Sequence, residues 1–236
     1  MMMEREEEHI VGGGKIRSAI LGLNDGLIST FTLLVGVAAA SFAGGGGVSL
    51  IILTGVAAMV SGSISMGLGE YISSKSEYTY IKNEIKKEKA EIELFPEEEK
   101  KEVKNYFTKM GLKGDTLDSC VESITSDKER WLNFLLKSEL GLEEPEPPLI
   151  GAFLTFISFI IGSLIPQIPY ILNLGFISLI LSSIISFGSL FIVGALKTRI
   201  TGEKKIKGAL EMVIIGIIAF TVSYLIGLSL ENLISL

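Results

Sequence analysis

The chain has 236 residues, of which 48% are apolar, and it carries a formal net charge of −6. Charged residues are nearly absent from five windows, at about 16–40, 48–72, 149–166, 171–196 and 206–230. A hydrocarbon core of about 30 Å requires about 20 helical residues, so each window predicts a transmembrane helix. This pattern excludes an ordinary soluble domain, and the absence of a basic stripe free of carboxylates excludes a typical nucleic-acid-binding protein.

The first window contains one carboxylate, Asp25, in an otherwise apolar stretch. A charged side chain facing lipid at this depth would cost about 2.5–3.5 kcal/mol on insertion scales. Such a group normally faces a bundle interior or a wet cavity and marks an ion or proton path. Asp25 therefore predicts a transport function.

Gly22 and Gly26 flank Asp25 in a small-xxx-small pair. Such pairs allow close helix contacts in lipid. One interpretation is that two copies of the first span meet here, which would place both Asp25 carboxylates on a dimer axis. The other is an ordinary helix contact within one protomer.

The second predicted span continues as a helix into a polar segment, as far as about Leu94. Pro96 suits the first turn of a new helix, which should end near Gly111. A short helix is then expected over 116–125. Residues 126–129 form a Ser-x-x-Glu pattern that predicts a capping box opening the last helix of this segment, with Ser126 as its N-cap.

The predicted domain organisation has three parts. Residues 1–75 hold the N-terminal tail and the first two spans, 76–147 form a helical domain, and 148–236 hold the last three spans. Pro166 and Pro169 predict a short turn between the third and fourth spans.

Glutamates recur at helical spacing in the polar segment, at Glu84, Glu88, Glu91, Glu99, Glu102 and Glu139. Many lysines lie nearby, so one interpretation is a solvated surface of Glu–Lys pairs. The other is that facing helices pool carboxylates and bind divalent cations through hard oxygen ligands. The spacing is compatible with both interpretations.

Every Lys and Arg falls in the N-terminal flank, in residues 73–148 or in the loop 197–207. Five spans bring these three segments to the same side of the membrane. The positive-inside rule then places the N-terminus and the polar domain in the cytoplasm and the C-terminus outside. His9 is the only histidine and Cys120 the only cysteine, so neither an enzyme nor an intrachain disulfide is predicted.

Two membrane motifs resemble the vacuolar iron transporter family. They are Leu-Gly-Leu-Asn-Asp-Gly-Leu-Ile-Ser at 21–29 and Ser-Ile-Ser-Met-Gly-Leu-Gly-Glu-Tyr-Ile-Ser at 63–73. The five-span plan and the Pro-rich segment at 144–148 resemble the same family. The resemblance implies an all-α homodimer with five transmembrane helices and a cytoplasmic metal-binding insert between the second and third.

The resemblance also implies export of Fe²⁺, and often Mn²⁺, from the cytosol in exchange for protons. It implies a pathway at the dimer interface that is lined by Asp25 and Met66. The metal ligands that it implies in the insert are Glu88, Glu91, Glu99, Glu102 and Glu139.

Two departures from the family pattern concern metal ligands. Plant-type members carry a Glu eight residues before the second-span Met, whereas this chain has Ala58 at that position. Plant-type members also carry a pair of Met residues in the insert, whereas this chain has Leu135 and Leu136. The loss of thioethers leaves a carboxylate-dominated site, which makes manganese a stronger candidate. Glu70, one turn after Met66, is a candidate replacement for the missing carboxylate, and pairing with Lys75 is the alternative.

We therefore expect a transporter with Fe²⁺ or Mn²⁺ as its substrate and without a resident cofactor. Other divalent cations are further expected ligands of the insert. The alternative is a membrane-anchored metal sensor or buffer that translocates nothing. The expected location is the plasma membrane of a prokaryote or a vacuole-like membrane of a eukaryote.

Overall fold

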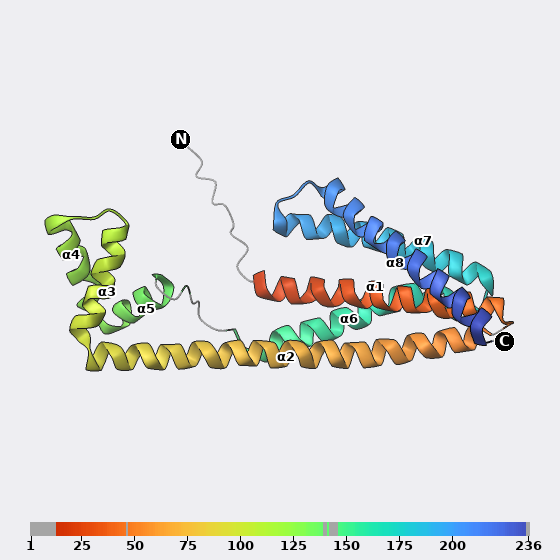
Figure 1. Cartoon of the computed structure of the whole chain (residues 1–236), viewed down its shortest axis with the longest axis horizontal. Coiled ribbons are helices and arrows are strands. Elements are labelled where there is room, and N and C mark those ends of the chain that lie inside the picture. The colour runs from red at the N-terminus through yellow and green to blue at the C-terminus, as the bar shows by residue number, and fades with distance from the viewer. Residues whose placement is uncertain (1–12, 46, 139–140, 142–145, 235–236) are drawn as a thin grey trace, which may run out of the picture. The chain divides into compact units, whose positions relative to one another are not determined.

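The computed structural model describes residues 13–45, 47–138, 141 and 146–234 (Figure 1). All regular elements in these ranges are helices, which confirms the predicted all-α class. They are α1 (Gly13–Ala43), α2 (Val48–Leu94), α3 (Pro96–Lys109), α4 (Gly114–Thr125), α5 (Lys128–Ser138), α6 (Pro148–Ile171), α7 (Phe176–Thr201) and α8 (Lys205–Ile234).

Five of the described helices are long and apolar enough to cross a membrane, namely α1, α2, α6, α7 and α8. The predicted number of candidate spans is therefore confirmed. The second span continues without a break to Leu94, also as predicted. The chain divides into two compact units, Met1–Ile72 with Leu149–Leu236 and Ser73–Pro148. We call the first the membrane unit and the second the insert.

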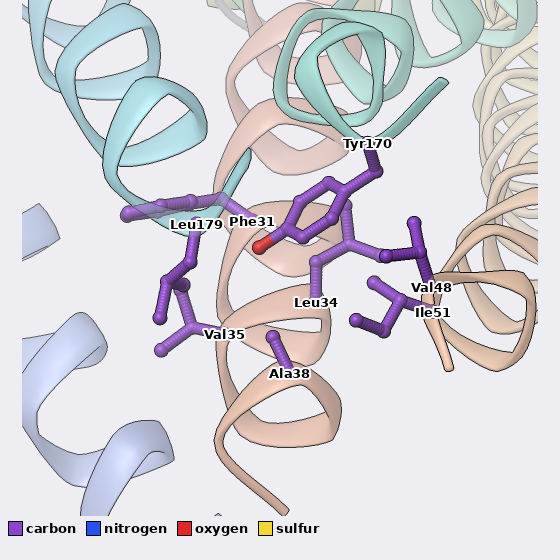
Figure 2. Close-up of a cluster of buried hydrophobic side chains, with 8 residues drawn as sticks. All are labelled: Phe31, Leu34, Val35, Ala38, Val48, Ile51, Tyr170 and Leu179. Carbon is purple, nitrogen blue, oxygen red and sulfur yellow. The ribbon is translucent and has the colours of Figure 1, made fainter. Parts of the chain in front are cut away.

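The core of the membrane unit forms around α1 (Figure 2). Phe31, Leu34, Val35 and Ala38 of α1 belong to one buried cluster with side chains of α2, α6 and α7. The Phe31 ring also stacks on Phe220 of α8, with ring centroids 6.0 Å apart. Half of the α1 span is buried but only 11% of the α8 span, so α1 is the central helix of this unit.

The glycines of α1 make close backbone contacts with α6 in the same protomer. A Cβ atom on Gly22 would overlap the carbonyl oxygen of Thr155, and one on Gly26 would overlap that of Phe159. In return, a Cβ on Gly162 of α6 would overlap the backbone of α1. Of the two interpretations of the glycine pair, the structure therefore supports the contact within one protomer.

The predicted turn at Pro166 and Pro169 is wrong. Helix α6 runs through both prolines to Ile171, and the chain turns afterwards, where Asn173 and Gly175 have φ of 52° and 60°. A proline removes a backbone donor, but neighbouring polar groups in a membrane bundle can satisfy the backbone of a broken turn. Ser182 of α7 also donates a hydrogen bond of 2.7 Å to the Pro166 carbonyl, which ties α7 to this part of α6.

The insert has its own apolar core, formed by the end of α2 and by α3, α4 and α5. Its buried side chains are Ile92, Val103, Leu117, Val121, Trp131, Leu132, Leu135 and Leu136. Pro96 is the first residue of α3 and Gly111 has φ of 96° just after that helix, both as predicted.

The predicted capping box at the start of α5 is shifted by one residue. Ser126 is the C-cap of α4. The Asp127 carboxylate instead accepts a 2.7 Å hydrogen bond from the backbone N–H of Arg130. An aspartate is a strong N-cap, and the connection between α4 and α5 is too short for Ser126 to fill that role while it ends α4.

Candidate functional site: a carboxylate cluster and a membrane aspartate

Two glutamates are buried in the insert where α2 and α3 meet. Glu88 of α2 is 7% exposed and Glu99 of α3 is 6% exposed, which is unusual for this residue type. The chain breaks at Phe95, between the end of α2 at Leu94 and the start of α3 at Pro96. Glu88 and Glu99 share a side-chain hydrogen bond. A carboxylate can only accept, so this bond requires a proton on one of the two groups.

The environment of Glu99 raises the pKa of its carboxyl to about 7. Burial is the largest cause, because it disfavours the charged form. The negative charges of Glu102, Glu88 and Glu91 act in the same direction, as does the hydrogen bond with Glu88, in which the protonated Glu99 is the donor. The structure therefore brings four of the predicted carboxylates close enough to affect one titration, and we call them the carboxylate cluster.

The other two predicted insert residues stand apart from this cluster. Glu84 is half-buried on α2, and Glu139 lies outside the described residues. Within the cluster, Glu91 also forms an ion pair of 3.8 Å with Lys87. Among the residues that the structure describes, no three His, Cys, Asp or Glu side chains are arranged to hold a metal ion. The cluster concentrates negative charge, but its oxygen atoms do not converge on one point.

A cavity of about 230 Å³ adjoins the cluster between α3 and α5. Its polar lining includes Glu102, Asn105 and Ser138. Leu135, one of the positions at which the family pattern has Met, also lines it. The cavity thus offers space beside the Glu102 carboxylate, and Lys109 adds a positive charge to the same lining.

The buried state of Glu99 predicts how the stability of the insert depends on pH. The pKa is about 7 in the folded insert against a usual value of 4.5, so the folded state holds this proton more tightly. The resulting stability is fully present below about pH 4.5 and is lost as the pH rises to about 7. We expect the denaturation midpoint to fall over this range, as measured by fluorescence of Trp131, the only tryptophan, in the insert core.

The matched variants for this prediction are Glu99→Gln and Glu97→Gln in the same helix. Glu97 is exposed, so its loss should leave the pH dependence as it is. Glu99→Gln should flatten the dependence. An unchanged slope in Glu99→Gln would contradict the assignment of this titration.

Asp25 lies on a half-buried side of α1, next to the glycines that contact α6. The stripe at four-residue spacing is Leu21, Asp25, Ser29 and Leu33, and both leucines are exposed. Ser29 Oγ donates to the backbone carbonyl of Asp25 at 2.5 Å. Among the described residues, the Asp25 carboxylate has no hydrogen bond or ion pair to another side chain. One protomer therefore leaves this carboxylate on a half-buried face of the central helix.

Glu70 of α2 lies where three helices of the membrane unit meet. Its Oε1 accepts a 2.8 Å hydrogen bond from Ser18 Oγ of α1. Thr155 of α6 donates from Oγ1 to the Ser18 carbonyl at 3.3 Å. A Cβ on Gly151, near the start of α6, would lie 3.1 Å from Glu70 Oε1, so the glycine leaves room for the carboxylate.

Sequence reasoning did not identify Ser18, Thr155 or Gly151 as part of this site. The available signal was weak, because small and polar residues within apolar windows usually serve packing. Met66, one turn before Glu70, is half-buried on α2, and so is Ala58.

Comparison with known proteins assigns most of this chain to one family. The VIT family matches residues 16–228. The chain is 34% identical to vacuolar iron transporter 1 of Arabidopsis thaliana, over 92% of this chain and 87% of that protein. It is 31% identical to the vacuolar iron transporter of Plasmodium falciparum, over 97% and 87% of the two chains. It is also 31% identical to protein CCC1 of Saccharomyces cerevisiae, over 86% and 65%.

The match includes both membrane motifs and the insert between them. The resemblance seen in residues 21–29 and 63–73 is therefore confirmed, and this chain belongs to the VIT family.

Proposed function

We propose that this protein exports Fe²⁺ or Mn²⁺ from the cytosol across a membrane in exchange for protons. The observation that carries the proposal is the Asp25 carboxylate on a half-buried face of an apolar helix, in a chain whose relatives are named vacuolar iron transporters. A charge in this position normally marks an ion or proton path. A carboxylate binds metal when ionised and releases it when protonated, so one group can couple the two fluxes.

The exposed side of α1 supports a homodimer with the pathway at its interface. A lone carboxylate facing lipid is costly, whereas a second protomer packed on this side would enclose both copies of Asp25. Gly22 and Gly26 are already in contact with α6, so the dimer contact would use the stripe with Asp25 and Ser29 instead. Met66 and Glu70 would be further pathway residues on α2.

The carboxylate cluster would collect metal before translocation. Its proposed ligands are Glu88, Glu91, Glu99 and Glu102, with Glu84 and Glu139 as further candidates. Because their oxygens do not converge, binding would require the more exposed Glu91 and Glu102 to move toward the buried pair. The bound metal would displace the proton between Glu88 and Glu99. Oxygen ligands suit Mn²⁺ well, while the names of the relatives favour iron.

The basic residues support an orientation. Helices α1 and α8 begin, and α7 ends, at the same end of the membrane unit, where the basic residues of that unit lie (Figure 1). The positive-inside rule would place this end and the insert in the cytoplasm and the C-terminus outside. The membrane would be vacuole-like in a eukaryote and the plasma membrane in a prokaryote.

Metal uptake into proteoliposomes under an imposed pH gradient tests the exchange. With the insert outside and an acidic lumen, we expect Mn²⁺ or Fe²⁺ to accumulate in the lumen. The accumulation ratio should rise about tenfold per pH unit for each proton exchanged, because one unit is worth about 1.36 kcal/mol. A protonophore should abolish this rise. Metal flux that does not depend on the pH gradient would rule out proton antiport, but it would still agree with metal transport.

A membrane-anchored metal sensor or buffer is the second candidate function. The observation that favours it is that the carboxylate cluster lies in a compact unit of its own. This candidate predicts metal binding that depends on Glu88 and Glu99, together with no flux in proteoliposomes. Saturable metal flux by the purified protein would exclude it.

A further inference from the structure

The connection between α7 and α8 is a strongly basic surface that the proposed function does not use. We define the basic turn as residues 197–207, which contain five of the 21 basic residues of the chain. Lys197 pairs with Glu211 at 3.3 Å and Lys207 with Glu203 at 4.0 Å. Lys204 and Lys205 are exposed, and neither forms an ion pair within the described part of the chain.

The backbone of the basic turn is held in place by tight packing. A Cβ on Gly194 of α7 would lie 2.8 Å from the Ala209 Cα of α8, so the two backbones are in direct contact. Gly202 adopts the left-handed conformation, with φ of 70°, and donates its N–H to the Thr198 carbonyl at 3.0 Å. The lysines are therefore presented from a defined hairpin between two helices.

The helix that follows makes the surface more positive. α8 begins at Lys205 and has no acidic residue in its first turn, although lysines occupy positions 205 and 207. The N-terminus of a helix carries unpaired N–H groups and a partial positive charge. Nearby lysines destabilise this end of the helix by repulsion, whereas an anion bound there stabilises it. α1 begins at the same end of the unit with Lys15 and Arg17 exposed and, again, no acidic residue in its first turn.

Apolar side chains locate this surface at the edge of the membrane. Ile206 is 69% exposed and Leu210 is 50% exposed, and they begin the apolar outer surface of α8. The lysines therefore lie where the hydrocarbon core gives way to lipid headgroups. Their alkyl stems can follow the apolar surface while the ammonium groups reach the phosphate layer.

We propose that the basic turn binds the phosphates of anionic phospholipids in the leaflet on this side. The charge is complementary, the anion is abundant at this depth, and two or more free ammonium groups can reach it together. Each basic residue near an anionic membrane surface contributes a similar amount to the free energy of binding. The proposal does not depend on which ion the protein transports.

Lipid binding to the full chain in a mild detergent tests the proposal. We expect dioleoylphosphatidylglycerol, but not dioleoylphosphatidylcholine, to remain bound in native mass spectrometry and to raise the melting temperature. The triple variant Lys204→Gln, Lys205→Gln, Lys207→Gln should weaken this binding on the order of 100-fold, at about fivefold per lysine. Raising the salt from about 0.05 to 0.5 M should weaken binding to the wild type in the same direction.

The matched control removes three exposed lysines from the insert, as Lys86→Gln, Lys100→Gln, Lys101→Gln. It lowers the net charge equally and should retain the affinity of the wild type within about twofold, since these lysines belong to the insert and not to the basic turn. Equal losses in the two triple variants would overturn the proposal. Equal binding of the two lipids, or binding of inorganic phosphate as tight as that of the anionic lipid, would also overturn it.

Discussion

Metal flux should fall by about 100-fold or more when Asp25 is replaced by Asn. The amide keeps the shape of the side chain but removes the charge that would bind the metal and exchange the proton. Loss of a group that only supports a metal ligand already costs about 10–100-fold, so loss of a direct ligand should reach at least the upper end. The measurement is the initial rate of Mn²⁺ or Fe²⁺ uptake in proteoliposomes, normalised to inserted protein.

The control for this variant is Glu211→Gln. Glu211 is also a carboxylate on an apolar helix, but it is half exposed and pairs with Lys197 at 3.3 Å. An exposed ion pair contributes only about 0–1 kcal/mol, so flux should remain close to that of the wild type. Asp25→Asn should also melt at the temperature of the wild type, since the carboxylate has no partner in the described protomer. Normal flux in Asp25→Asn would remove Asp25 from the pathway.

Gly162→Ala should destabilise the membrane unit by about 3 kcal/mol, the upper end of the usual cost of overpacking. The added Cβ would overlap the backbone of α1 at Leu23 and Leu27, and a backbone cannot move aside as a flexible side chain can. Gly26→Ala should act in the same way against Phe159. For a chain of this size we expect a decrease in melting temperature of about 10 °C in detergent.

Gly188→Ala and Gly69→Ala are the matched controls. Both glycines lie in helices, and no atom lies within 4 Å of an added Cβ. The alanine should be neutral or stabilising by up to about 1 kcal/mol, because glycine is a weaker helix former. If Gly26→Ala and Gly162→Ala melted like these controls, the close contact between α1 and α6 would not exist. The glycine pair would then be free for the contact between two first spans.

The local sequence pattern was sufficient to predict the helices that could span a membrane and their number. Five long apolar windows predict five candidate spans because the bilayer sets a fixed length for a helix that crosses it. The continuation of α2 to Leu94 and the start of α3 at Pro96 follow from the absence of breakers in one segment and the restricted φ of proline at the boundary. The importance of Asp25 is likewise visible in the sequence, since a charge in an apolar window is informative before any fold is known.

Prolines and caps show where local pattern failed. Pro166 and Pro169 normally interrupt a helix, but α6 continues through both of them in a packed bundle, where Ser182 of α7 also contributes a hydrogen bond to the Pro166 carbonyl. Ser126 and Asp127 are both good N-caps, and the end of the preceding helix decides between them. In each case the outcome depends on a group outside the motif.

The sequence by itself determined the class of this protein, the number of apolar helices and the candidate residues on them, because each depends on spacing along one helix. Tertiary structure decided which candidates meet. It buried Glu88 against Glu99, where spacing was also compatible with a solvated surface. It also directed Gly26 toward α6, which left Asp25 on a half-buried side of α1 next to that contact. The physical reason is that burial and hydrogen bonding depend on the neighbouring helix, and the residues of that helix are distant in the chain.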